Sequence, residues 1–513
     1  MQSPQCILAL QHPSGWDAWT KITAACKARR VTSLSCLKVV LLGALVFSAP
    51  SGLVAQTATR PNIVVIMTDD QTLESLRVMS KTRTLLGDEG TTFRNFYCSF
   101  PLCAPSRATF LTGQYAHNHG VLGNQAPEGG YTALNHNNTL AVWLQDAGYF
   151  TSHIGKYLNG YGRLTPTTLV PPGWTDWQGL VDNSTYSSYN YTINDNGTLV
   201  TYGETEADYQ TDVLTNRAVA TIDEAMVQQP FFLSIATLAP HVESAANPPS
   251  GARPPPRYIG AFKNEPLYKP PSFNEANVSD KPAEIRRLPL LDASNIQQRT
   301  SRYRGELGAL LAVDDLVERV VNELAATGVL NNTVVIFTSD NGLFHGEHRI
   351  RAGKSRVYEE ASHVPLLIRG PGFPQGITAK QVVANIDLAP TIVDFAGADA
   401  RREMDGRSLL ALAQDSSVAT GRSLLIEAQG KSKPSSEEGA IVKYKAVRNK
   451  SFLYVEYTTG ERELYDMRPG TANYDPYQLR SRHASSAYNQ IKTQLRTKLS
   501  KLRTCSGTSC AVQ

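Results

Sequence analysis

The sequence predicts an α/β fold that is followed by a smaller C-terminal α+β subdomain. Two short runs, Asn62–Met67 and Val334–Thr338, are apolar and rich in β-branched residues, which is typical of buried parallel strands. Apolar residues recur at helical spacing over residues 305–327, directly before the second run, and this predicts a crossover unit. Beyond about residue 418, short alternating strands and a helix over residues 487–502 replace this pattern.

The first 55 residues have the pattern of a secretory signal peptide or leader. Three basic residues at positions 27 to 30 precede an apolar run over residues 37–47, and small residues follow. The run is shorter than the stretch of about 20 apolar residues that spans a bilayer, so we expect no stable membrane insertion. An uncleaved anchor and a start downstream of Met1 remain open. The expected location is secreted, periplasmic or lumenal.

Without this leader the chain is close to neutral. The whole sequence holds 50 Lys and Arg against 46 Asp and Glu. Residues 1–55 contain five of the former and one of the latter, which leaves 45 of each. Nucleic-acid-binding proteins carry a strong basic excess, so the composition argues against a nucleic-acid partner.

Four cysteines follow the leader. Cys505 and Cys510 are close enough in sequence to close a small disulfide loop in an oxidising compartment. Cys98 is then unpaired, or it pairs outside this scheme. Cys103 is considered below.

Oxygen-bearing side chains follow the two predicted strands. Asp69 and Asp70 come directly after the first, and Asp340 and Asn341 follow the second. Open α/β sheets place ligands at the carboxyl ends of their strands, and adjacent buried carboxylates are costly unless they are paired or metal-bound. Such an oxygen set suits a hard divalent cation, most simply Ca²⁺. A helix cap by aspartate and an ordinary Asp-Asn-Gly turn are the alternatives.

The most informative stretch runs from Pro101 to Gly113. Pro105 suits a first helical turn, and Gly113 suits a helix end. Cys103 would therefore face a helix N-terminus, where exposed amides favour an anion such as sulfate or phosphate, with Arg107 one turn further on. Taken alone, a cysteine before a helix is more often a small core residue.

Further cationic candidates follow other predicted strands. Lys156 comes after the strand at residues 150–154, and His241 comes after the strand at residues 231–236. Lysines are mostly exposed, and a histidine can be structural, so neither is decisive alone. Residues 343–360 are dense in cations, among them Lys354, which could stabilise charge on departing oxygens. Residues 248–271 form a proline-rich, basic surface loop that either attracts an anionic glycan or is merely solvated.

The segment Cys103-x-Pro105-Ser106-Arg107, followed by Leu111-Thr112-Gly113, resembles the signature of the sulfatase family. The resemblance implies an alkaline-phosphatase-like central mixed sheet flanked by helices over residues 60–417, with the subdomain over residues 418–513. It also implies that a formylglycine-generating enzyme oxidises Cys103 to 3-oxoalanine (formylglycine), whose hydrate is the nucleophile.

The resemblance further assigns roles to the other candidates. Asp69, Asp70, Asp340 and Asn341 would hold Ca²⁺ together with the oxidised Cys103. Arg107 would hold the nucleophile, Lys156 and Lys354 would grip sulfate, and His241 would act as acid or hydrogen-bond donor. The roles of His345 and His348 stay open.

One departure from the family pattern carries information about the substrate. Many sulfatases place a histidine two residues after the lysine, where this chain has Leu158. The variant over residues 155–160, with residues 171–174 and 183–197, resembles the glucosamine-6-sulfatase branch. We therefore expect a sulfated amino sugar of the N-acetylglucosamine-6-sulfate type, with Trp174 or Trp177 stacking on the sugar. A broad arylsulfatase acting on aryl sulfates, a phosphonate or phosphodiester hydrolase of the same superfamily, and a noncatalytic glycan-binding relative are the alternatives.

Overall fold

The computed structural model describes residues 60–243, 251–415, 421–430 and 440–512. The predicted leader and the predicted subdomain boundary at residue 418 lie outside these residues. All described residues belong to one compact unit. Among them, no helix is both long enough and apolar enough to cross a membrane.

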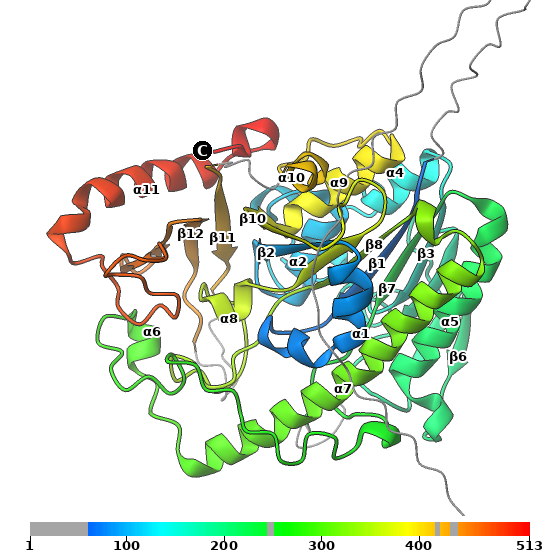
Figure 1. The fold of residues 1–513 in the computed structure, drawn as a ribbon, viewed down its shortest axis with the longest axis horizontal. Coiled ribbons are helices and arrows are strands. Elements are labelled where there is room, and N and C mark those ends of the chain that lie inside the picture. Colours follow the sequence, from blue (N-terminus) through cyan, green and yellow to red (C-terminus); the bar gives the residue numbers. More distant parts are fainter. Residues whose placement is uncertain (1–59, 244–250, 416–420, 431–439, 513) are drawn as a thin grey trace, which may run out of the picture. The chain divides into compact units, whose positions relative to one another are not determined.

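Ten strands of the described chain form one mixed sheet (Figure 1). In chain order they are β1 (Asn62–Thr68), β2 (Thr91–Tyr97), β3 (Phe150–Gly155), β4 (Asp176–Leu180), β5 (Thr192–Asp195), β6 (Thr198–Thr201), β7 (Phe231–Ala236), β8 (Thr333–Ser339), β9 (Leu366–Arg369) and β10 (Ile377–Ala384). Their order across the sheet is β10-β2-β9-β8-β1-β7-β3-β4-β5-β6.

The centre of this sheet is parallel. β1 pairs in parallel with β8 on one side and with β7 on the other, and β7 continues in parallel to β3. Thr68 lies opposite Ser339 at the end of the β1–β8 pair. The carboxyl ends of these neighbouring strands therefore meet at one edge, and the residues that follow them are brought together. Antiparallel pairs flank this centre, at β9 and at β5 and β6.

The α-helices of the described chain lie between these strands or after them in the sequence. They are α1 (Ser80–Thr82), α2 (Cys103–Thr112), α3 (Ala116–His119), α4 (Leu140–Asp146), α5 (Gln210–Ala225), α6 (Ala283–Arg286), α7 (Ala293–Ala326), α8 (Glu359–Ser362), α9 (Leu388–Ala396), α10 (Leu410–Gln414) and α11 (Asn489–Leu502). The helix predicted over residues 305–327 is α7, and it begins earlier because Asp292 caps it by accepting a hydrogen bond from the amide of Asn295.

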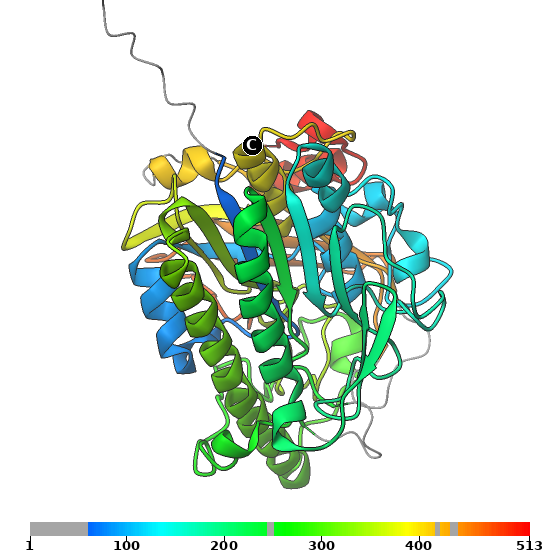
Figure 2. The ribbon, with the colours of Figure 1, turned by 90° about the vertical axis from the view of Figure 1, so that its right-hand side faces the viewer.

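Helices cover both faces of the sheet. α5 and α7 lie side by side on one face (Figure 2), and their apolar residues pack around Val64 and Ile66 of β1. α2, α4 and α9 pack around Ile63 and Val65 on the opposite face. Successive residues of β1 thus enter two different cores, as expected for a strand that is buried on both faces.

A second, antiparallel sheet follows in the chain. Its strands are β11 (Ser423–Ala428), β12 (Tyr444–Asn449), β13 (Phe452–Tyr457) and β14 (Arg462–Asp466), and α11 packs on it. Buried Arg448 of β12 ties this sheet to the large one. Its Nη2 donates to the hydroxyl of Tyr97 at 2.7 Å, and its Nε donates to Glu359 at 2.8 Å.

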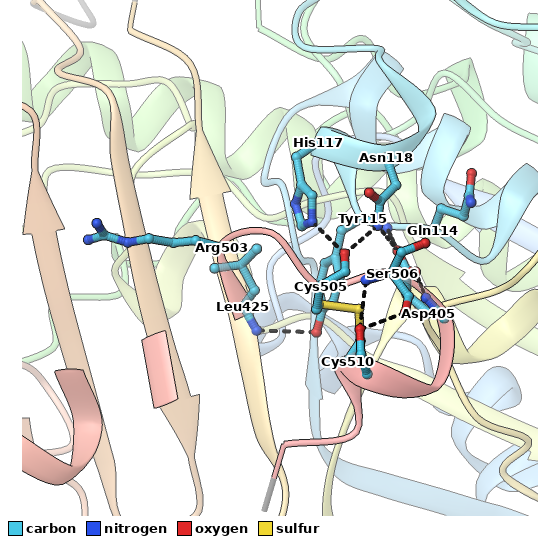
Figure 3. The surroundings of a disulfide bond; sticks show 12 residues. Gln114, Tyr115, His117, Asn118, Asp405, Leu425, Arg503, Cys505, Ser506 and Cys510 are labelled. Carbon is cyan, nitrogen blue, oxygen red and sulfur yellow. Dashed lines mark hydrogen bonds between the residues drawn. A yellow bond between two sulfur atoms is a disulfide. The ribbon is translucent and has the colours of Figure 1, made fainter. Parts of the chain in front are cut away.

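The predicted disulfide between Cys505 and Cys510 is present (Figure 3). The carbonyl of Cys505 contacts His117 Nε2 at 3.0 Å and accepts from Asn118 Nδ2 at 2.8 Å. Asp405 accepts from the amide of Gly507 at 2.7 Å. The disulfide loop is therefore bonded to α3, the helix that directly follows α2. Cys98 and Cys103 are free thiols.

Candidate active site

The predicted site residues converge at the carboxyl edge of the parallel strands. Asp69 and Asp70 follow β1, Asp340 and Asn341 follow β8, and the other candidates come from α2 and three loops. Each of them contacts at least one other member of the set. These contacts are described below, beginning with the cysteine.

Cys103 is the first residue of α2. Leu102 before it is extended, and Gly113 ends the helix with a φ of 66°, so the predicted helix start and end are both confirmed. The Sγ atom lies 3.4 Å from Asp69 Oδ1 and 2.9 Å from Lys354 Nζ. Burial and the nearby Asp69 raise the pKa of the Cys103 thiol to about 12, so the unmodified side chain stays protonated at neutral pH.

Asp69 and Asp340 lie beside this cysteine, and Asp70 and Asn341 extend the cluster. Asp69 is fully buried, and Asp340 and Asp70 are nearly so. The amide of Asp70 donates to Asp340 Oδ1 at 3.2 Å, and the φ of 66° at Asp70 turns the chain back toward β8. Asn341 donates from Nδ2 to Asp70 at 2.6 Å, while its buried Oδ1 has no hydrogen-bond partner among the described residues.

This donor set fits a hard divalent cation. One ligand atom each from Asp69, Cys103 and Asp340 lies within 4.8 Å of the others, and the same holds for Asp69, Asp70 and His241. Carboxylate oxygens are the ligands that Ca²⁺ prefers, and the buried Oδ1 of Asn341, which has no hydrogen-bond partner among the described residues, is a further candidate ligand.

Each carboxylate has a cationic side chain beside it. The pairs are Lys156 with Asp69, Lys354 with Asp70, and Arg107 with Asp340, the last at 2.8 Å. Burial would raise the pKa of Asp69, but Lys156 and the other cations hold it below its ordinary value. Burial and the neighbouring Asp69 raise the pKa of Asp340. Three carboxylates and three cationic side chains thus balance one another in a buried cluster. Such a cluster suits the joint binding of a metal cation and an oxyanion.

His241 lies at the edge of this cluster. Its Nδ1 is 2.7 Å from the carbonyl of Val242 and so carries the proton of the neutral ring. Its Nε2 lies 3.5 Å from Asp70 Oδ2. With Nδ1 tied to the main chain, Nε2 is the atom that faces the site and can exchange a proton there.

Tyr186 is a site residue that the sequence does not single out. Lys156 Nζ lies 4.8 Å from the centre of its ring, and the ring of His241 lies 5.0 Å away. Its hydroxyl accepts from Asn159 Nδ2 at 2.6 Å. Tyr186 belongs to the stretch 183–197 that carries the substrate resemblance, but a tyrosine in an irregular loop gives no periodic signal of its own.

Two expectations from the sequence need correction or completion. The prediction that Trp174 or Trp177 stacks on a sugar was wrong, because both are buried, at 5% and 0% exposure, against His153 and each other. Aromatic type alone does not distinguish a sugar platform from a core residue.

His345 contacts Glu306 at 3.3 Å and His348 contacts Glu275 at 2.7 Å, so both have partners outside the cysteine cluster.

Comparison with known proteins agrees with this geometry. The family described as Sulfatase matches residues 61–398, and the one described as N-sulphoglucosamine sulphohydrolase, C-terminal, matches residues 346–505. The chain belongs to the sulfatase family. This sulfatase is therefore a sulfuric ester hydrolase.

Two curated sulfatases and one solved structure illustrate the relationship. N-acetylglucosamine-6-sulfatase of Homo sapiens is 36% identical over 492 residues, which cover 89% of this chain and 87% of that protein. The arylsulfatase of Volvox carteri is 33% identical over 528 residues, covering 92% and 78%. A structure solved in complex with its substrate D-glucosamine-2-N,6-O-disulfate aligns with a TM-score of 0.73 at 24% identity, covering 86% and 97%. The alkaline-phosphatase-like α/β fold with a smaller C-terminal antiparallel sheet is confirmed.

Proposed function

We propose that this sulfatase hydrolyses a sulfate monoester on an amino sugar of the N-acetylglucosamine-6-sulfate type, with formylglycine at position 103 and bound calcium. The observation that carries the proposal is the position of Cys103, buried at the start of α2 between Asp69 and Lys354. The substrate class rests on the human relative, which matches over most of both chains.

Calcium would be held by Asp69, Asp70, Asp340 and the free Oδ1 of Asn341, next to the side chain at position 103. When bound, the cation and the formylglycine hydrate supply an activated oxygen nucleophile and polarise a sulfate oxygen. Because the carboxylates are already matched by Arg107, Lys156 and Lys354, a divalent cation gives the site a net positive charge. That charge favours a sulfate group and the more negative transition state.

The cationic side chains have separate tasks in this proposal. Lys354 contacts Cys103 directly, and Lys156 pairs with Asp69, which also contacts Cys103, so both lysines orient the sulfate oxygens around the nucleophile. Arg107 donates to Asp340 and to the carbonyl of Lys156, and so holds α2 against the strand ends. In its protonated form, with a proton on each ring nitrogen, His241 donates the Nε2 proton to the departing sugar oxygen, which is a poor leaving group without one.

The sugar is expected to lie against Tyr186 rather than against a tryptophan. The ring of Tyr186 contacts both Lys156 and His241, the two residues that act on opposite sides of the scissile bond in this proposal. An aromatic ring in that position keeps the lysine and the histidine at a fixed separation.

An arylsulfatase of broad specificity is the second candidate. It is favoured by the Volvox carteri relative, which covers most of this chain. Aryl sulfates have good leaving groups and need little proton donation, so the same site would cleave them with a smaller contribution from His241.

The proposal includes a location and a processing partner. The signal-like leader over residues 1–55 and the oxidising environment implied by the Cys505–Cys510 disulfide favour a secreted, periplasmic or lumenal protein. The extracellular sulfatase homologue of Drosophila melanogaster is 38% identical over 363 residues, which cover 69% of this chain and 31% of that protein. A formylglycine-generating enzyme acts on Cys103 during biosynthesis.

The test combines mass spectrometry with a desulfation screen. The protein is made with and without a formylglycine-generating enzyme, the peptide that contains residue 103 is weighed, and turnover is measured on sugars sulfated at single positions. We expect formylglycine in active protein and the fastest turnover on the 6-sulfate of N-acetylglucosamine. Active protein with only a thiol would contradict the nucleophile, and turnover of aryl sulfates alone would favour the second candidate.

A further inference from the structure

A groove of about 660 Å³ lies apart from the cysteine cluster, since none of the proposed catalytic or calcium-binding residues lines it. It is bordered by β2, by the segment after β1, by α8 and by the loop that follows β14. Figure 1 shows α8 between β12 of the small sheet and the blue segment that contains α1. The volume is within the range of about 300–1,000 Å³ that small-molecule sites occupy.

Three exposed tyrosines are among the residues that line this groove. Tyr268, Tyr474 and Tyr477 are 42%, 44% and 36% exposed, which is high for such large side chains. They come from two loops far apart in the sequence. An aromatic ring offers a flat apolar face and, in tyrosine, a hydroxyl at its edge, a combination that suits the mixed apolar and polar faces of a sugar ring.

Three exposed cations also line the groove. Arg94, Lys380 and Lys450 line the groove from β2, β10 and the β12–β13 turn, and none of them forms an ion pair with another described residue. They therefore present uncompensated positive charge to a ligand.

The carboxylates of the groove, by contrast, are engaged within the protein. Glu359 accepts from Arg448 at 2.8 Å and contacts His363 at 3.0 Å, and Glu74 pairs with Arg77. Burial raises the pKa of both Glu347 and Glu360 to about 7, which lowers the negative charge of the groove lining. The charge available to a ligand is thus mainly positive.

We infer that this groove is a second binding site, for a segment of an anionic glycan chain. The tyrosines stack on sugar rings, and the three cations contact sulfate or carboxylate groups along the chain. Thr72 of the groove lies two residues after Asp70, and Leu343 lies two residues after Asn341, so the groove wall continues directly from the calcium-binding loops. A long chain held here stays beside the catalytic loops between encounters, which favours polymers over monosaccharides.

Direct binding measurements test this inference. The probe is a heparin-derived sulfated hexasaccharide, titrated into the full chain carrying Cys103→Ala so that no turnover occurs. Lys380→Gln combined with Lys450→Gln should weaken binding on the order of tenfold, because two exposed charge contacts are lost. Tyr474→Ala should also weaken it, and Lys501→Gln combined with Lys492→Gln, the same charge change on α11, should not. Unchanged affinity in the groove variants would overturn the inference.

Two further probes decide the class of ligand. A neutral hexasaccharide should bind much more weakly than the sulfated one, and polyglutamate of matched charge should not depend on Tyr474. Polyglutamate that binds as tightly as the glycan, with the same loss in Tyr474→Ala, would point to an acidic peptide and overturn the glycan assignment. Because turnover is not measured, the inference is independent of the proposed function. If glycan binding depends on Tyr474 and Lys380 but the protein desulfates no amino sugar, the groove remains a glycan-binding site and the proposed substrate is wrong.

Discussion

Arg107 Nε donates to Asp340 Oδ2 over 2.8 Å, which ties the helix that begins with Cys103 to the end of β8. The same guanidinium donates from Nη1 to the carbonyl of Lys156 at 2.8 Å. One buried side chain thus joins three segments that carry the site. A substitution in any one of these segments is expected to disturb the others, so the effects of substitutions in different segments on activity should not be additive.

The proposed calcium ligands should act as a unit. Asp69→Asn and Asp340→Asn should each lower kcat/KM at least about a hundredfold, because each removes an oxygen from the same ion and uncovers a buried cation. The double variant should be little worse than either single variant, since the ion is already lost. Activity and bound calcium are measured on the same samples. Asp88→Asn, an exposed control, should keep both, and full activity after exhaustive chelation would refute the role of the metal.

The role of His241 should depend on the leaving group. His241→Ala should lower kcat on a sugar sulfate about a hundredfold or more, because the departing alkoxide loses its proton donor. On an aryl sulfate the loss should stay below about tenfold, since a phenolate departs without help. Parallel kinetics on the two substrates give the comparison. Equal losses would show that His241 positions the sulfate and transfers no proton.

The ring of Tyr186 should matter more than its hydroxyl. Tyr186→Phe keeps the face that lies on Lys156 and His241, whereas Tyr186→Leu removes it. A cation–π contact contributes about 0.5–2 kcal/mol, so the leucine variant should lose on the order of tenfold in kcat/KM and the phenylalanine variant much less. Thermal unfolding of both variants serves as a control for the fold. Equal losses in the two would instead assign the effect to the hydrogen bond from Asn159.

The stability of the protein should decrease as the pH rises, because of a buried carboxyl group outside the cysteine cluster. Burial raises the pKa of Glu284 to about 7, against the opposing effect of Arg356. The folded state then holds a proton that the unfolded state has released, so stability is greatest below the unfolded pKa near 4.5 and declines as pH rises toward 7. The decline from this group is about 1.4 kcal/mol per pH unit.

Removing that group should flatten the pH dependence. The melting temperature of Glu284→Gln, relative to the unchanged protein, should rise steadily between pH 5 and pH 7.5, because the glutamine releases no proton. Glu128→Gln, at an exposed position, should follow the unchanged protein throughout. A constant difference between Glu284→Gln and the unchanged protein across this range would show that Glu284 titrates normally.

Much of the catalytic edge could be predicted from the sequence, because its parts are local. Short β-branched runs define β1 and β8, and the polar residues directly after them must lie at the carboxyl edge of a parallel sheet. Pro105 and Gly113 define α2 in the same way. The disulfide follows from the short separation of Cys505 and Cys510.

The remaining features depend on contacts between distant segments. β2 and β10 mix polar and apolar residues, and their pairing with each other and with β9 completes them as strands. The position of Tyr186 depends on a loop that returns to Lys156, and the burial of Trp174 and Trp177 depends on a cluster of aromatic residues from several segments. Residue type and spacing predict neither the position of Tyr186 nor the burial of the two tryptophans.

The burial of Cys103 also sets a time limit on its chemistry. The side chain is 1% exposed. Asp340 and Lys354 both lie beside it, and both belong to segments that are translated long after residue 103. We therefore expect a modifying enzyme to reach the cysteine while those segments are still being made, and not after they have folded over it. The proposed oxidation therefore has to precede completion of the fold, and a purified, folded thiol form should stay a thiol when it is later mixed with that enzyme.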